Sequence, residues 1–154
     1  MPIISKIYRS ELSRIRKLGA SIRHDKRFLL KKSRERGYDL GGLFVYPKRI
    51  YINPSVKKYA KRLNILLHEE GHYLDDSFCN SSLMWTEYRA EQNVLNRALK
   101  LNNKELLKIT IANIKYCSSM RFKKQYPNLL FYYYASKRLM RTKLWTTVLK
   151  RINK

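Results

Sequence analysis

The residue types best suited to chemistry stand together in one short segment, His68-Glu69-Glu70-Gly71-His72. Side chains four positions apart share a helix face, so His68 and His72 can point two imidazoles at one cation. Zinc accepts neutral imidazole, and a catalytic zinc keeps one coordination position for water. Glu69 would take a proton from that water, because zinc lowers the pKa of bound water to about 7. The spacing therefore predicts a zinc site with a general base, and the alternative is two exposed histidines whose spacing is coincidental.

The third protein ligand of such a site must be a carboxylate, because no histidine follows His72 and His24 lies far upstream. Glu87 and Glu91 are the candidates, four residues apart on a largely apolar face of an expected helix. Burying an unpaired carboxylate is costly, and a metal or a metal-bound histidine would supply the partner. We expect Glu87 to bind the metal and Glu91 to accept a hydrogen bond from a ring N–H of His68 or His72. The alternatives are Glu91 as ligand, or two glutamates exposed near a helix start, where negative charge is favoured.

The acidic residues gather around this motif, whereas the rest of the chain is basic. Between His68 and Glu91 the only basic residue is Arg89, against six acids, namely Glu69, Glu70, Asp75, Asp76, Glu87 and Glu91. Residues 106–154 hold twelve Lys or Arg and no acid, and the net charge of the chain is +23. An acidic centre suits a divalent cation. The basic surroundings attract polyanions, so nucleic acid is a candidate partner, and the alternative is a lysine-rich protein without such a partner.

A helical N-terminal part and a short β element should precede the motif. We expect a helix over about 6–36, broken in two if Gly19 interrupts it, with Gly37 as its C-cap. Residues 43–46 and 50–52 are rich in β-branched and aromatic types and flank a proline. This pattern predicts a short hairpin or two edge strands.

The motif itself should lie at the end of a helix. Asn53-Pro54 is a helix-start signal, so the motif helix is expected from there to about Leu74. Three further helices are expected over about 83–101, 105–120 and 128–152, the first capped by Ser82 and the last two separated near Pro127.

Length and composition favour one domain, since the 154 residues contain no internal repeat and no Pro/Gly/Ser-rich linker. We predict a single α+β domain, mostly helical, over residues 1–154. Its core would cover about 43–101, with the β element placed before the motif helix. A basic helical part would follow over about 104–152.

The basic C-terminal part interleaves aromatic and cationic residues, with Phe131-Tyr132-Tyr133-Tyr134 followed by Lys137, Arg138 and Arg141. Such a mixture can bind nucleic acid through stacking and phosphate contacts. The same residues also fit an amphipathic helix that packs on the domain and leaves its cations in solvent. We expect the aromatic side chains to pack inside, and the role of the cations stays open.

No apolar run reaches the roughly 18 residues of a membrane-spanning helix, so no membrane partner is expected. The N-terminus lacks the basic segment and apolar stretch of a secretory signal, and Cys79 and Cys117 do not suggest a disulfide framework. These features predict an intracellular, cytoplasmic protein, or a virion-associated one if the chain belongs to a virus.

The motif and the later segment Glu87-Tyr88-Arg89-Ala90-Glu91 together resemble the gluzincins, zincin-like metallopeptidases with a glutamate as third ligand. The small intracellular ImmA/IrrE-like metallopeptidases look most similar, since they too place a short β element before the motif helix. They also carry a Glu-x-x-Ala-polar segment on the next helix, although Glu91 departs from their usual Asn or Asp. The resemblance covers roughly residues 43–100. It implies one Zn²⁺ per chain, with Glu69 as general base and Glu87 as third ligand.

The function that the resemblance implies is that of a zinc metalloendopeptidase acting on a protein or peptide substrate. We expect the substrate to add a strand to the β edge formed by residues 43–52. A further group must stabilise the oxyanion of the tetrahedral intermediate. The candidates are His24, Tyr88, Tyr116 and Arg121. Of these, His24 is expected to be a surface residue of a basic helix.

Two rivals belong to other classes of function. One is a nucleic-acid-associated protein that keeps the zincin fold and uses its charge for binding. The other is a structural or assembly protein of a virus or mobile element, in which the metal site only stabilises the fold.

Overall fold

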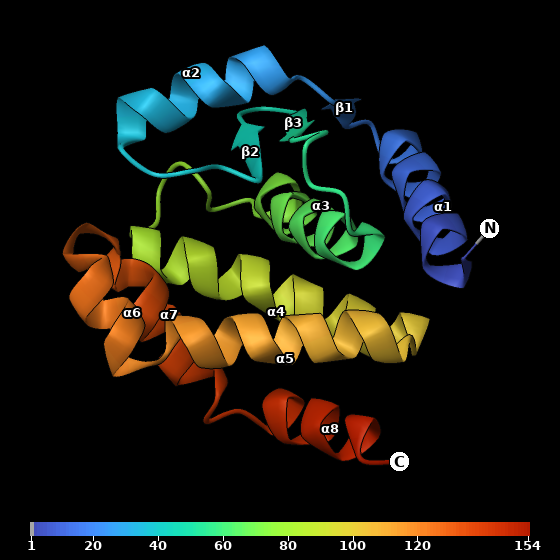
Figure 1. Ribbon diagram of the computed structural model, residues 1–154, viewed down its shortest axis with the longest axis vertical. Helices are drawn as coiled ribbons and strands as arrows, with labels where there is room; N and C mark the ends of the chain where they lie inside the picture. The colour runs from blue at the N-terminus through green and yellow to red at the C-terminus, as the bar shows by residue number, and fades with distance from the viewer. Residues whose placement is uncertain (1) are drawn as a thin grey trace.

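The computed structural model describes residues 2–154, which form eight α-helices, one 3₁₀ helix and a three-stranded sheet (Figure 1). The expected class, α+β and mostly helical, is confirmed. In chain order the elements are α1 (Ile3–Lys17), β1 (Ser21–Arg23), α2 (Lys26–Arg36), β2 (Gly42–Val45), β3 (Arg49–Ile52), α3 (Tyr59–Leu74), α4 (Leu83–Leu101), α5 (Lys104–Cys117), α6 (Met120–Gln125), η1 (Pro127–Leu129), α7 (Leu130–Leu139) and α8 (Lys143–Ile152).

The sheet has the order β1-β3-β2, which leaves one edge of β2 without a strand partner. β2 and β3 form the expected hairpin, paired antiparallel with Leu43 opposite Tyr51. β1 pairs with β3 in parallel, with Ile22 opposite Ile50. The free edge of β2 is therefore available to a further extended chain.

The prediction of helix over 6–36 missed the strand β1, which follows Gly19. Gly19 ends the first helical part with φ +108°, and the next residues turn into the sheet. The N–H of Ser21 donates to the carbonyl of Lys48 at 2.8 Å. The second helix starts at a new cap, since the Asp25 carboxylate accepts from the N–H of Phe28 at 3.0 Å. Gly37 ends α2 as predicted.

The predicted start of the motif helix at Asn53-Pro54 is wrong, because α3 begins at Tyr59. The Asn53 side chain accepts from the N–H of Ser55 at 2.9 Å, so it closes a local turn instead of capping a helix. The guanidinium group of Arg62, inside α3, donates to the carbonyls of Pro54 and Val56. These bonds hold the segment before the helix in a non-helical conformation.

The single helix predicted over 128–152 is also wrong, since α7 and α8 are separate. The hydroxyl of Thr142 accepts from the N–H of Trp145 at 3.2 Å and starts a new helix. The helix predicted over 105–120 is shorter than expected, because α5 ends at Cys117 and α6 starts at Met120.

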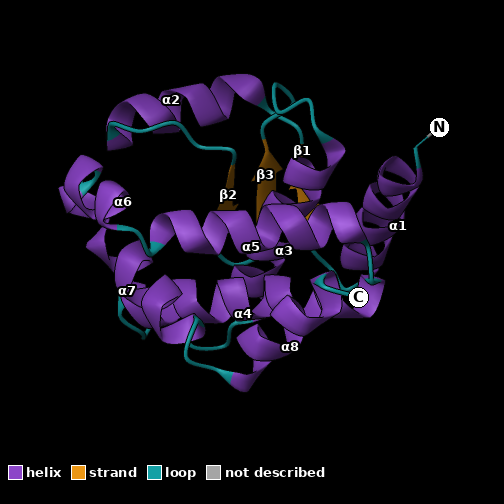
Figure 2. Ribbon diagram, turned by 60° about the horizontal axis from the view of Figure 1, so that its bottom comes forward, coloured by secondary structure: helices purple, strands orange, loops and turns teal. Residues whose placement is uncertain are grey.

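Helix α3 occupies the centre of the molecule, with the sheet and α2 on one side and α4 with α5 on the other (Figure 1). One apolar core joins α1, the sheet, α3 and α4 to the helices after residue 104, through residues such as Ile114, Leu139 and Val148. Figure 2 shows the strands as a small part of an otherwise helical structure. Across residues 2–154, no helix combines the length and apolar character that a bilayer-spanning segment requires.

Candidate metal centre

The centre is built by α3 and α4, which pack against each other at Gly71. A Cβ atom on Gly71 would lie 2.6 Å from the Cα of Ala90 and 3.0 Å from its carbonyl oxygen, so only glycine fits this contact. The glycine lies between the two motif histidines and Ala90 lies between the two glutamates of α4. The close approach therefore brings the polar residues of both helices together.

His68, His72 and Glu87 each contribute one possible ligand atom, and these atoms all lie within 4.8 Å of one another. Nε2 of His68 is 2.8 Å from Oε2 of Glu87, and Nε2 of His72 is 3.3 Å from Oε1 of the same carboxylate. His72 and Glu87 are buried and His68 is half-buried. Two imidazoles and a carboxylate form the donor set that catalytic zinc sites use.

Glu91 lies behind His68 and not beside the three converging atoms. Its Oε1 atom is 2.5 Å from Nδ1 of His68, so the carboxylate orients that ring and leaves Nε2 facing Glu87. A carboxylate that holds the far nitrogen of a metal-binding histidine is a common arrangement. The structure thus places Glu87 beside both histidines and Glu91 beside His68 alone, while the role of Glu87 as a metal ligand stays a prediction.

Unsatisfied polar atoms mark where a cation would fit. Of these, Oε2 of Glu87 is buried, belongs to the converging group and lacks an aligned hydrogen-bond partner, although it lies close to Nε2 of His68. Oε2 of Glu91 and Nδ1 of His72 are also unpaired, but they are not the atoms that approach Glu87. A buried carboxylate oxygen that faces two imidazoles without an aligned bond fits a shared metal ion, since leaving buried polar groups unpaired is otherwise costly. The residues present therefore fit a zinc ion.

Electrostatics in the metal-free centre favour an ion pair. Burial alone would lower the pKa of His68, but the carboxylates of Glu87 and Glu91 outweigh it and raise that pKa well above its usual value. Burial alone would raise the pKa of Glu87, but the imidazoles of His68 and His72 outweigh it and lower that pKa to about 2. The centre thus holds a proton where a cation would bind.

Glu69 is buried next to this centre and faces the sheet. Burial raises its pKa above the usual value, and His68 and His72 partly oppose that shift. The backbone of Phe44 in β2 also opposes the rise in this pKa. A Cβ atom on Gly42 would lie 2.4 Å from Cγ2 of Ile65 and 3.3 Å from Cγ of Glu69, so the glycine allows β2 to lie directly over the motif helix.

Two adjoining cavities open beside the centre. The larger, about 780 Å³, has His68, Glu69 and Glu91 in its wall, and the smaller, about 580 Å³, has Glu87. The walls of both include Tyr38, Tyr126, Leu129 and Tyr132. Chain segments before and after the motif therefore enclose the approach to the centre.

The four residues proposed from the sequence to stabilise an oxyanion are not equally placed. Tyr116 lines the larger cavity, where its hydroxyl donates to Gln125 at 3.1 Å. Neither cavity wall includes His24, Tyr88 or Arg121 among the described residues. His24 is exposed, as expected, but it lies in the loop after β1 and not on a helix, with Nε2 2.9 Å from the Tyr8 hydroxyl.

Tyr132 is the residue that the sequence did not single out. It lines both cavities from α7. Burial raises the pKa of Tyr132 well above its usual value, and the nearby carboxylates of Glu87, Glu69 and Glu91 raise it further. The phenol is therefore protonated at neutral pH and lies within electrostatic reach of the centre. Within a run of four aromatic residues, no sequence signal separated this one from its neighbours.

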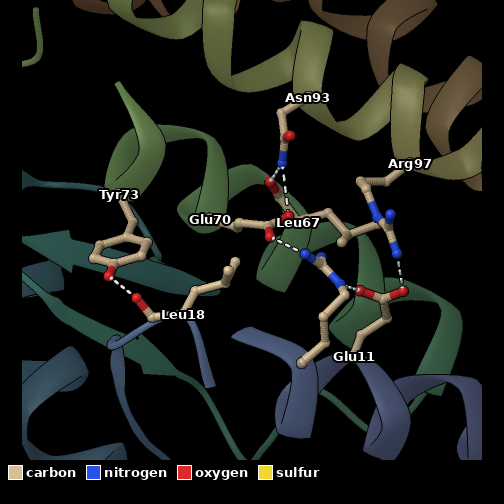
Figure 3. A network of polar contacts seen from close by, with 8 residues as sticks. Glu11, Leu18, Leu67, Glu70, Tyr73, Asn93 and Arg97 are labelled. Atoms are coloured by element: carbon tan, nitrogen blue, oxygen red, sulfur yellow. Dashed lines mark hydrogen bonds and ion pairs between the residues drawn. The ribbon is translucent and has the colours of Figure 1, made fainter. Parts of the chain in front are cut away.

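A second polar cluster supports the back of the motif helix (Figure 3). Glu70 is fully buried and 2.7 Å from Nη1 of Arg14, which also pairs with Glu11. Glu11 in turn pairs with Arg97 of α4. The Asn93 amide donates to Oε1 of Glu70 at 3.0 Å and to the carbonyl of Leu67 at 2.7 Å (Figure 3). The cluster ties α1, α3 and α4 together on the side away from the cavities.

In comparisons with known proteins, no family model, no curated protein and no solved structure matches the chain.

Proposed function

We propose that this protein is a zinc-dependent metallopeptidase of the gluzincin type. The observation that carries the proposal is the position of Glu69, which follows the candidate ligand His68, packs against Gly42 of the edge strand β2 and lines the larger cavity together with both residues. A buried base, a candidate metal site and an unpaired strand edge beside a cavity are the parts that hydrolysis of an extended peptide requires.

The free edge of β2 offers the substrate two residues. The N–H of Asn53 donates to the carbonyl of Gly41 at 2.8 Å, and hydrogen-bonded pairs alternate along an antiparallel ladder. Gly42 and Phe44 therefore direct their backbone groups away from β3. Glu69 lies beside this strand, since a Cβ atom on Gly42 would be 3.3 Å from its Cγ. A peptide paired with Gly42 would extend past this point and place a carbonyl next to the base.

Each residue of the centre has a role in this proposal. His68, His72 and Glu87 would hold the zinc, and Glu91 would fix the His68 ring. Bound zinc would supply a Lewis acid that polarises the carbonyl and lowers the pKa of water. Glu69 would accept the proton of the attacking water and return it to the leaving amine.

Tyr132 is the oxyanion-stabilising group in this proposal. Its protonated hydroxyl would donate a hydrogen bond to the carbonyl oxygen as negative charge develops there. Tyr132→Phe should lower kcat by about 10²- to 10³-fold with little change in KM or zinc content. Tyr116→Phe removes another hydroxyl of the same cavity wall and should have a much smaller effect.

The first test is zinc content after exhaustive dialysis, measured by elemental analysis. We expect about one zinc per chain in the wild type, a sharp loss in Glu87→Gln and no loss in Glu69→Gln. Cleavage of a mixed peptide library, followed by mass spectrometry, should occur with the wild type and disappear with Glu69→Gln. Absence of zinc from the wild type, or cleavage that survives Glu69→Gln, would overturn the proposal.

A further inference from the structure

Nearly half of the acidic residues are buried, which makes the surface more positive than the net charge suggests. Five of the eleven acids are buried, namely Glu11, Glu69, Glu70, Glu87 and Glu91. None of the 34 Lys and Arg residues, all of which lie within the described part of the chain, is buried. Outward-facing charge is therefore almost entirely of one sign, and such a surface attracts polyanions at long range.

One part of this surface combines cations with exposed rings. Trp85, near the start of α4, is 40% exposed, and Tyr134 on α7 is 47% exposed. The guanidinium carbon of Arg138 lies 5.0 Å from the centre of the Trp85 ring. Tyr134 and Arg138 lie four residues apart on α7 and share one side of that helix, and Arg141 follows in the turn after it. We call these four residues the aromatic–basic surface.

The charge on this surface is not neutralised from within the protein. Among residues 2–154, no carboxylate pairs with Arg138 or Arg141. Neither α7 nor α8 contains an acidic residue. Of the two acids in the loop before α4, Asp75 pairs with Arg89 at 2.9 Å and Asp76 is exposed.

We propose that the aromatic–basic surface binds single-stranded nucleic acid, with bases stacked on Trp85 and Tyr134 and phosphates on Arg138 and Arg141. Base–aromatic stacking needs unpaired bases, and cations near the exposed rings can contact the phosphates of the same strand. The apolar side of α8, with Trp145 and Val148, packs in the core, so it offers no face for insertion into a membrane.

The position of this surface relates it to the candidate centre without depending on it. Leu83 and Glu87 flank Trp85 on α4, and both line the smaller cavity. Proteins bound to the same nucleic acid would thus be held near the cavities. Binding itself requires neither zinc nor hydrolysis, so its test is independent of the proposed peptidase activity.

Tryptophan fluorescence tests the proposal directly, because Trp85 is exposed and the only other tryptophan, Trp145, is 4% exposed. Titration with an oligothymidylate at physiological salt should quench the Trp85 emission. In Trp85→Phe the remaining Trp145 emission should not be quenched, while affinity, measured by anisotropy of a labelled oligonucleotide, stays near that of the wild type.

Variants separate stacking from charge. Trp85→Leu should weaken oligonucleotide binding by about fivefold to a hundredfold, as the loss of one base stack does. Arg138→Gln should also weaken it clearly, whereas Arg27→Gln, which removes the same charge from exposed α2, should have a much smaller effect. Circular dichroism of each variant confirms that the fold is retained.

Three results would overturn the proposal. One is no oligonucleotide binding at physiological salt. The second is binding that leaves Trp85 emission unchanged and that Trp85→Leu does not weaken, which would indicate unspecific charge attraction alone. The third is tighter binding of a polyglutamate peptide or of anionic phospholipid vesicles, which would assign the surface to an acidic protein or a membrane.

Discussion

The backbone of Ala90 packs on Gly71 so closely that a side chain on Gly71 would place its Cβ 2.6 Å from the Cα of Ala90. This contact sets the distance between α3 and α4 at the level of the candidate ligands. Gly71→Ala should therefore push the helices apart, weaken zinc binding at least about tenfold and lower the free energy of unfolding by about 1–3 kcal/mol. Zinc titration and urea unfolding measure the two effects.

The double variant that combines Gly71→Ala with Ala90→Gly provides the control for this prediction. The close contacts of the added Cβ are with backbone atoms of Ala90, so removing the Ala90 side chain should not rescue Gly71→Ala. Wild-type zinc affinity in Gly71→Ala would show that the helix spacing does not govern the centre.

Glu91 should tune the centre without being required for it. Glu91→Gln weakens the 2.5 Å contact with Nδ1 of His68 and should lower zinc affinity by about 10- to 100-fold while about one zinc still binds at saturation. Glu87→Gln removes a ligand and should reduce affinity further. Glu105→Gln changes an exposed carboxylate and should have no effect. Equal losses in Glu87→Gln and Glu91→Gln would contradict the division of roles.

Zinc binding should strengthen as pH rises through neutrality, because the metal must displace the proton that Glu87 and Glu91 hold on His68. Titration calorimetry in two buffers of different ionisation enthalpy should detect that released proton. A zinc affinity that is constant between pH 6 and 8 would contradict a raised pKa of His68 in the metal-free protein.

The same ion pair gives the metal-free protein a defined pH window of stability. Glu87, with its pKa lowered from 4.5 to about 2, stabilises the fold above pH 4.5 and loses this effect as pH falls toward 2. His68, with its pKa raised above 6.5, stabilises the fold below pH 6.5 and loses the effect as pH rises through the raised value. The destabilisation caused by Glu87→Gln should therefore be largest between pH 4.5 and 6.5, in urea unfolding of the metal-free protein.

The buried cluster behind α3 should contribute far more stability than a surface pair. Arg14→Met leaves the buried carboxylates of Glu11 and Glu70 with fewer partners and should cost about 3–5 kcal/mol. Lys32→Met breaks the exposed pair with Glu35, 3.1 Å apart, and should cost about 1 kcal/mol or less. Urea unfolding measures the free energy of unfolding of both variants. Similar losses would show that the buried ion pairs contribute no more stability than the exposed pair.

The two cysteines should differ strongly in reactivity. Cys79 is exposed, whereas burial and the nearby Glu91 raise the pKa of Cys117 to about 12. At pH 8 only about one in ten thousand Cys117 thiols would be ionised. Iodoacetamide should therefore alkylate Cys79 first, and peptide mass spectrometry can follow both sites. Fast labelling of Cys117 would indicate that the larger cavity is more open and polar than the structure shows.

The residues that lie together in the candidate centre could be selected from the sequence because its signals are local, whereas zinc binding stays a prediction. The spacing of His68 and His72 is a property of one helix, and Glu87 and Glu91 follow the same rule on the next. The sequence alone did not show that the two helices meet at Gly71 and Ala90, because this contact depends on how the helices pack.

Elements held by tertiary contacts were harder to predict. The strand β1 is three residues long and has no periodicity of its own, and its partner β3 lies far along the chain. Asn53 and Thr142 are both cap-type residues, yet only Thr142 starts a helix, because Asn53 bonds within a turn. Tyr132 stands in a run of aromatic residues whose members differ only in what the fold places around them.

All the residues of the candidate centre lie within positions 68–91, on two successive helices joined by the short segment 75–82. Its candidate ligands are therefore brought together by one helical hairpin, in which Gly71 and Ala90 set the spacing. The cavities are also lined by segments from elsewhere in the chain, from α2, α5, α6 and α7. Substitutions in those segments would thus change what can reach the centre without altering any of its candidate ligands.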